Sequence, residues 1–199
     1  MRFSIAIPIH DTPNTAFFLS RLLKSLAEQT FKDYEIVITK DGPMAHNHNS
    51  AILKSKGELI KIMQMDDYFA HPNALQEISD NFEGEWLISA CAHTNGKDVF
   101  NPHTPAWSDY MFTGNNTLGG FSTLTIRNEG KLLLEEPLTW LVDCDLYWRY
   151  YLKYGPPKLL NDVNVIVDVG THRLTSTLDD ELKRKEVEYM IKKYDTRKL

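Results

Sequence analysis

The chain has 199 residues, of which 42% are hydrophobic and 25% charged. This length and composition fit a single globular domain with one full-sized core, and they exclude a disordered chain and a fibrous repeat. The net charge of −5 and the pI near 5.8 argue against a general nucleic-acid binder, because such proteins concentrate Lys and Arg to neutralise phosphates. We therefore expect no nucleic-acid partner.

The two cysteines, Cys91 and Cys144, are too few for a disulfide framework. Nothing at the N-terminus resembles a cleavable signal, and no apolar run approaches the roughly 20 residues needed to span a bilayer. These features predict a reducing, cytoplasmic setting without a membrane span.

The first half of the sequence alternates between strand and helix patterns. Apolar, β-branched runs predict strands over 3–9, 34–39 and 58–65, and apolar residues at helical spacing predict helices over 14–29 and 49–56. Because parallel strands need crossover connections rather than tight turns, this rhythm predicts a parallel α/β sheet.

The second half is less regular. We predict helices over 72–82, 139–154 and 178–194, and strands over 85–91, 121–127 and 164–169. The segment 93–120 is rich in Asn, Pro, Thr, Gly and aromatic residues and has no sustained periodicity, which is typical of functional or mobile loops. No repeat or low-complexity segment interrupts the chain, so a single α/β domain over 1–199 is expected.

Acidic residues follow each of the first three predicted strands. Asp11 follows the first, Asp41 the second, and Asp66 and Asp67 the third. Ligands of open α/β sheets bind beyond the carboxyl ends of the strands, and two adjacent carboxylates suit Mg²⁺ or Mn²⁺. The alternative for the acidic pair is a solvated turn or a helix N-cap before Pro72, and Asp41-Gly42-Pro43 is equally typical of a turn.

Asp143 and Asp145 lie at the start of the predicted helix over 139–154. Carboxylates there either complement the helix dipole or include a general base held in a cleft. The aromatic residues of that helix are expected in the core, whereas Trp107 and Tyr110, in the irregular segment, are candidates for stacking on a sugar ring.

The histidines give weaker signals. His46 and His48 lie two apart in what we expect to be a loop, so we interpret them as solvated rather than as a metal clip. His172 follows the last predicted strand, where it is either a phosphate or metal contact or a surface histidine.

The order of elements and motifs resembles the inverting family-2 glycosyltransferases with the GT-A fold. The strand FSIAIPIHD over 3–11, the segment ending in Gln29-Thr30 and a second strand ending in Asp41-Gly42 are similar to the opening of that family. KGELIKIMQMDD over 56–67 is similar to the family's strand that runs into its metal-binding Asp-x-Asp motif. The resemblance implies a single Rossmann-like GT-A domain with a mostly parallel central sheet flanked by helices.

The resemblance also implies a function: a metal-dependent transferase that passes a sugar from a UDP-sugar, as hexosyltransferases do, to a saccharide or other acceptor hydroxyl. Residues 1–92 would bind the nucleotide-sugar, 93–177 the acceptor and the catalytic groups, and 178–199 would form a C-terminal helix. Asp143 would be the base of a single displacement with inversion, and Asp145 would lie near the acceptor with Trp107 and Tyr110. The implied donor-side residues are Pro8, Ile9, His10, Asp11, Asp41 and Asp66 for the nucleotide, and Asp66, Asp67 and His172 for Mn²⁺ or Mg²⁺ on the diphosphate.

Three positions depart from the family pattern. Lys40 replaces the first acid of Asp-Asp-Gly, Gln64 or Met65 replaces the first acid of Asp-x-Asp, and Val142 replaces the Glu before the base. Counting from Gly57 favours Asp66 as the main metal ligand, and counting back from Pro72 favours Asp67. The alternative function is therefore a non-catalytic nucleotide- or glycan-binding relative. A sugar nucleotidyltransferase is disfavoured, since residues 8–13 hold no glycine and no Lys or Arg.

Overall fold

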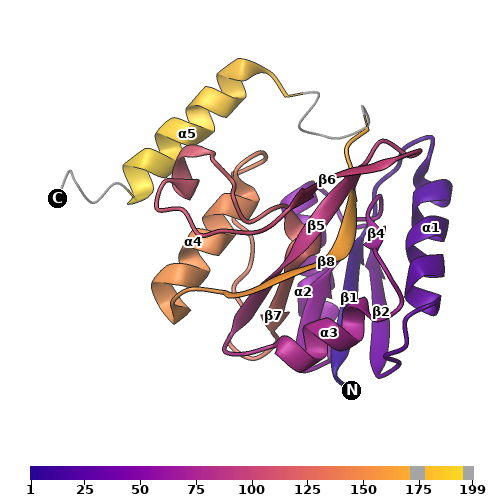
Figure 1. The fold of residues 1–199 in the computed structure, drawn as a ribbon. Coiled ribbons are helices and arrows are strands. Elements are labelled where there is room, and N and C mark those ends of the chain that lie inside the picture. The colour runs from indigo at the N-terminus through magenta and orange to yellow at the C-terminus, as the bar shows by residue number, and fades with distance from the viewer. Residues whose placement is uncertain (171–177, 195–199) are drawn as a thin grey trace.

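A computed structural model describes residues 1–170 and 178–194. In these residues the chain forms one mixed sheet with helices on both faces (Figure 1). The strands are β1 (Phe3–Pro8), β2 (Tyr34–Thr39), β3 (Leu59–Ile62), β4 (Tyr68–Phe69), β5 (Trp86–Thr94), β6 (Val99–His103), β7 (Leu124–Arg127) and β8 (Lys158–Asp168). The helices are α1 (Thr15–Ala27), α2 (Met44–Lys54), α3 (Ala74–Asn81), α4 (Val142–Tyr154) and α5 (Asp180–Tyr194), with 3-10 turns η1 (Met111–Thr113) and η2 (Phe121–Thr123).

The sheet has the order β2-β1-β3-β7-β5-β8-β4, with β6 paired to β5. β1 pairs in parallel with β2 and β3, and β5 pairs in parallel with β8. β7 runs antiparallel between β3 and β5, so β1, β2, β3, β5 and β8 share one direction and β4, β6 and β7 oppose it. The expected α/β domain with a mostly parallel sheet and flanking helices is confirmed.

Two apolar clusters cover the two faces of this sheet. α1 and α3 pack on one face, where Leu22 and Ile78 are fully buried. α2, α4 and α5 pack on the other face, around buried Trp86 and Tyr147. Figure 1 shows α5 at the upper left edge of the molecule, next to α4 and away from the strands.

No helix in the described part of the chain combines the length and the apolar composition that a membrane span requires. A cytoplasmic location stays a prediction.

The structure corrects several predicted boundaries. α2 begins at Met44 rather than at 49, so His46 and His48 lie in its first turns and not in a loop. The two-residue strand β4 and the strand β6 were not expected, and 121–123 forms a 3-10 turn before β7. β6 is largely exposed and β4 has only two residues, so neither gives an apolar strand pattern in the sequence. β6 is a strand because it pairs with β5, and β4 because it pairs with β8.

Candidate functional site

A pocket of about 310 Å³ lies where the first and third strands end and α4 begins. Four of the residues predicted to bind the donor or to catalyse the reaction contribute to its wall, and they come from three separate segments of the chain. These residues are Pro8, His10, Asp66 and Asp143. The position agrees with the rule that ligands of open α/β sheets bind beyond the carboxyl ends of the strands.

Asn47, in the first turns of α2, joins the ends of two strands at this pocket. Its side chain is buried, its Nδ2 donates to the Ile9 carbonyl at 2.8 Å, and its Oδ1 accepts from the Asp41 backbone N–H at 2.9 Å. Thr39 Oγ1 donates to the Asn47 carbonyl at 3.1 Å. Asn47 was not predicted as a site residue, because nothing in the loop-like HNHNS segment distinguishes it from its neighbours.

The other residues predicted to bind the nucleotide do not contribute to the pocket wall. The Asp11 carboxylate is exposed and forms a 2.7 Å ion pair with Lys40. The Asp41 carboxylate accepts hydrogen bonds from Ser50 and, at 2.9 Å, from Lys54. The bond from Ser50, followed by that from Lys54, lowers the pKa of Asp41 below its ordinary value. The Asp41 side chain therefore faces α2, and a role on the nucleotide stays a prediction.

The adjacent acids after β3 point in different directions. Asp66 contributes to the pocket wall, and its carbonyl accepts a hydrogen bond from the Arg21 guanidinium. Asp67 is buried, and its Oδ1 accepts from the Asp168 backbone N–H at 2.9 Å. The same Arg21 forms a 2.7 Å ion pair with Asp168, which joins the ends of β3 and β8.

Residues 1–170 and 178–194 contain no group of three or more His, Cys, Asp or Glu side chains arranged to hold a metal ion. His172 lies outside the described residues. Metal binding by Asp66, Asp67 and His172 stays a prediction.

Asp143 enters the pocket from the first turn of α4. Its Oδ2 accepts from Asn116 Nδ2 at 2.8 Å, and its Oδ1 accepts from the Cys144 backbone N–H at 2.7 Å. Burial raises the pKa of this carboxyl to about 6, while the hydrogen bonds from Cys144 and Asn116 oppose that rise. The group is therefore ionised at neutral pH and still basic enough to take a proton.

Asn116 holds that carboxylate in place. Its Nδ2 also donates to the Gly119 carbonyl at 2.9 Å, and its Oδ1 accepts from the backbone N–H groups of Leu118 and Gly119 at 3.0 and 3.1 Å. The side chain is thus fixed by the turn that it forms. Asn116 was not predicted as a site residue, because it is one of several Asn residues in the irregular segment 93–120 and no sequence pattern distinguishes it.

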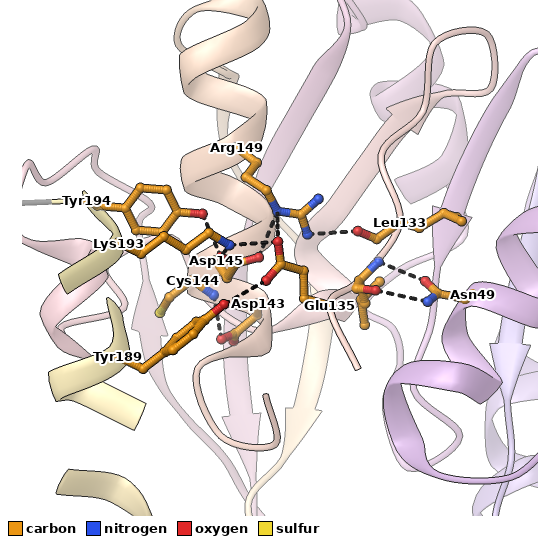
Figure 2. Close-up of polar contacts among 11 residues, drawn as sticks. Asn49, Leu133, Glu135, Asp143, Cys144, Asp145, Arg149, Tyr189, Lys193 and Tyr194 are labelled. Carbon is orange, nitrogen blue, oxygen red and sulfur yellow. Dashed lines mark hydrogen bonds and ion pairs between the residues drawn. The ribbon is translucent and has the colours of Figure 1, made fainter. Parts of the chain in front are cut away.

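Asp145 has a different environment from Asp143. It is fully buried, and its carboxylate accepts from Arg149 at 2.7 Å, from Lys193 at 2.8 Å and from Tyr194 at 2.5 Å. Figure 2 shows these groups converging between α4 and α5, with Glu135 beside them. Asp145 is not part of the pocket wall, and its predicted place near an acceptor has no support from this arrangement.

The predicted stacking residues also differ from each other. The Trp107 ring stacks on Tyr151 with centroids 4.0 Å apart and on Trp148 at 5.4 Å. Tyr110 is exposed. Neither residue contributes to the pocket wall, and their contact with an acceptor stays a prediction. The expected core position of the α4 aromatics is confirmed for Tyr147 and Tyr150, which are buried.

His46 and His48 were both interpreted as solvated, and for His48 this is wrong. His46 is exposed beside Glu136, at 3.2 Å. His48 is 5% exposed and contributes to the pocket wall, where its ring packs against Phe121. The error follows from the loop expected over 44–48, since in a helix residues two apart face different directions.

α5 contacts the segment that forms part of the pocket wall just before α4. The Glu186 carboxylate, which is buried, accepts three backbone hydrogen bonds of 2.8–2.9 Å from Thr139, Trp140 and Leu141. Thr139 and Trp140 contribute to the pocket wall, and Leu141 precedes α4. A carboxylate at unpaired N–H groups before a helix stabilises that helix start, so α5 holds the segment that carries Asp143.

Comparisons with known proteins give a match of fold only. No family model matches the chain, and no curated protein matches it by sequence. Among solved structures, S. aureus TarS 1-349 in complex with UDP-GlcNAc is similar with a TM-score of 0.71 and 17% identity, over 96% of this chain and 66% of that one. TarS 1-349 in complex with UDP is similar with a TM-score of 0.65 and 17% identity, over 96% and 71% of the two chains.

A further structure of S. aureus TarS is similar with a TM-score of 0.65 and 17% identity, over 98% of this chain and 44% of that one. This chain therefore spans less than half of that structure. The comparison supports the glycosyltransferase fold expected from the sequence.

Proposed function

We propose that the protein transfers a sugar from a UDP-sugar donor to an acceptor hydroxyl by a single displacement that inverts the anomeric configuration. The observation that carries this proposal is the pocket that brings Asp66, at the end of β3, together with Asp143, at the start of α4. The similar fold of TarS structures in complex with UDP and UDP-GlcNAc supports a donor of this class.

Asp143 is the proposed general base. A base must be ionised at the working pH and within hydrogen-bond reach of the acceptor hydroxyl. The pKa of Asp143, although raised to about 6, is still below 7, so the carboxyl is ionised near neutral pH and the first condition is met. Asn116 and the Cys144 N–H fix the two carboxylate oxygens, so the carboxylate needs little reorganisation when the hydroxyl oxygen attacks the anomeric carbon. Phe121 and Trp140, in the same pocket, limit the water that competes with the acceptor.

Asp66 is the proposed metal ligand. Mg²⁺ in phosphate sites is commonly held by one or two carboxylates, substrate phosphates and water, so a single pocket carboxylate facing a diphosphate fits such an ion. When bound, Mn²⁺ or Mg²⁺ supplies charge neutralisation for the leaving diphosphate. Asp67 is the weaker candidate because Oδ1 already accepts from Asp168.

The test is a screen of UDP-sugars with Mn²⁺, followed by UDP release and by calorimetric binding. We expect one or more donors to be turned over by the wild type, and Asp143→Asn to bind the donor but release UDP at a rate reduced by a factor on the order of 10³. Asp162→Asn, at an exposed position, is the matched control and should leave both quantities unchanged.

A second candidate is a non-catalytic nucleotide- or glycan-binding protein. The observation in its favour is Gln64 in the pocket wall, where the resemblance expects the first metal-binding acid. Donor binding without UDP release in the wild type would establish it, and the absence of any binding of uridine nucleotides would contradict both candidates.

A further inference from the structure

His48, a residue of the pocket wall, carries a ring nitrogen with no hydrogen-bond partner among residues 1–170 and 178–194. Its Nδ1 lies 2.8 Å from the Met44 carbonyl oxygen. A carbonyl only accepts, so Nδ1 carries the proton. Burial, with His10 nearby, lowers the pKa of His48 to about 4 against the opposing effect of the Met44 bond, so the ring is neutral at pH 7. Its Nε2 is then a bare acceptor, and this buried atom has no hydrogen-bond partner among the described residues.

A buried acceptor without a partner destabilises the folded chain, by about 1–3 kcal/mol in typical cases. The ring is nevertheless held in one orientation: Nδ1 is tied to the backbone of α2, and the ring face packs on Phe121 with centroids 4.8 Å apart. Nε2 lies on the side of the imidazole away from Cγ, and the residue contributes to the pocket wall. A ligand with a hydrogen-bond donor would satisfy an acceptor that is fixed in a residue of the pocket wall and that the described residues leave without a partner.

We infer that His48 is a specificity-determining residue whose Nε2 accepts a hydrogen bond from a neutral N–H or O–H of the bound sugar nucleotide. The inference rests on the proposed function. A lone pair at this point repels the anionic oxygens of a diphosphate, so the group beside His48 is the base or a hydroxyl. Two groups supply the same chemistry: the imide N–H of uracil, which cytosine lacks, and a hydroxyl of the ribose or of the transferred sugar.

Calorimetry with UDP, CDP and UDP-GlcNAc in the presence of Mn²⁺ separates these sources. His48→Phe removes the acceptor but keeps an aromatic ring against Phe121, and we expect it to weaken UDP-GlcNAc binding about tenfold, because the ligand donor is left unpaired. His48→Gln, which keeps a neutral acceptor oxygen, should recover part of this loss. His46→Phe, at an exposed position of the same helix, is the matched control.

The pattern across the three ligands identifies the donor group. An imide N–H predicts that the wild type prefers UDP over CDP and that His48→Phe reduces this preference. A ribose hydroxyl predicts an equal loss for UDP and CDP, and a sugar hydroxyl predicts a loss for UDP-GlcNAc alone. Binding of all three ligands within twofold of the wild type would overturn the inference while leaving the proposed function intact. Failure of the wild type to bind any of them would overturn both.

A measurement on the wild type guards against a variant that folds poorly. In ¹⁵N-labelled protein, an unprotonated imidazole nitrogen resonates far from a protonated one and moves toward it on accepting a hydrogen bond. We expect the Nε2 resonance of His48 to move in this way on saturation with the ligand that binds. An unchanged resonance at saturation would overturn the inference.

Discussion

The two sides of α4 place two aspartates of similar sequence context in opposite environments. Asp143 faces the pocket, where one amide side chain and one backbone N–H donate to its carboxylate and burial raises its pKa. Asp145 faces α5, and its carboxylate pairs with Arg149 of its own helix and with Lys193 of α5. Among the described residues no cation pairs with Asp143, so its carboxylate is suited to proton transfer, whereas Asp145, between two cations, is suited to a structural link.

The charges around Asp145 reinforce this contrast. Burial alone would lower the pKa of Lys193, but hydrogen bonds with Asp145 and Glu135 outweigh it and raise that pKa above its ordinary value. Glu135 pairs with both Arg149 and Lys193 and accepts a hydrogen bond from Tyr189 of α5 (Figure 2). The acids Asp145 and Glu135 and the cations Arg149 and Lys193 therefore connect α4 to α5. The pocket side of α4 is thus arranged for chemistry and the α5 side for rigidity.

The largest expected effect is on turnover and tests the pocket side. If Asp143 is the base, kcat/KM for donor turnover should rise with pH and level off above a midpoint near 6, because only the ionised carboxylate takes a proton. Below the midpoint the rate should fall about tenfold per pH unit. Asp143→Asn should abolish this rise of kcat/KM with pH and most of the rate. A wild-type profile that is flat between pH 5 and 7 would contradict the assignment.

The second effect is on stability and tests the α5 side. Asp145→Asn removes a buried charge from between Arg149 and Lys193, and breaking such a pair typically lowers the free energy of unfolding by about 3 kcal/mol. Urea unfolding at pH 7 measures this loss. A loss below about 1 kcal/mol would show that the network does not hold α5.

Asp143→Asn is the matched control, and it should raise the free energy of unfolding, whereas Asp145→Asn should lower it. The folded-state pKa near 6 exceeds the ordinary value of 3.8, so the folded protein binds more protons and loses stability as the pH rises from about 4 to about 6. At pH 7 the amide removes that penalty. We expect a gain of about 1 kcal/mol, reduced from the full linkage because the side chain is partly exposed to the pocket.

A smaller effect is expected where α5 supports the pocket. Glu186→Gln leaves one acceptor oxygen for three backbone N–H groups and removes a favourable charge at the start of α4. We expect a loss of about 1–2 kcal/mol in unfolding free energy and weaker UDP binding, since Thr139 and Trp140 contribute to the pocket wall.

Glu188→Gln is its control, because Glu188 is exposed and its 3.6 Å pair with Arg184 is a surface ion pair, typically contributing less than about 1 kcal/mol. Equal losses in the two variants would show that the buried carboxylate has no special role.

The smallest expected effect is a shift in the pKa of Asp143 when its hydrogen bond from Asn116 is removed. Asn116 Nδ2 donates to the carboxylate and stabilises its charged form, so Asn116→Ala should raise the pKa of Asp143 further. The midpoint of the pH–rate profile should therefore move to higher pH, with a modest loss of kcat. Asn95→Ala, in an exposed turn, should leave the midpoint in place. A downward shift for Asn116→Ala would contradict this arrangement.

Local pattern was enough to predict the order of most strands and helices. Apolar runs of period two and the helical spacing of 14–29, 139–154 and 178–194 report burial of a strand or of one helix face, which neighbouring residues decide. The predicted strands over 3–9 and 34–39 agree with β1 and β2 to within one residue. α2 was placed five residues late, because polar residues at a helix start resemble a loop.

The sequence by itself determined that Asp66 follows a buried strand and that Asp143 and Asp145 open a helix, and residues two apart on a helix necessarily point to different sides. Which side meets the pocket and which meets α5 was decided only by the tertiary structure. The same holds for Trp107, whose ring stacks on α4, and for His48, a residue of the pocket wall whose Nε2 has no hydrogen-bond partner in the described part of the chain. The physical reason is that a side chain's charge state and partners depend on segments distant in the chain, such as α5 on Asp145 and Asn116 on Asp143, and no local pattern encodes those contacts.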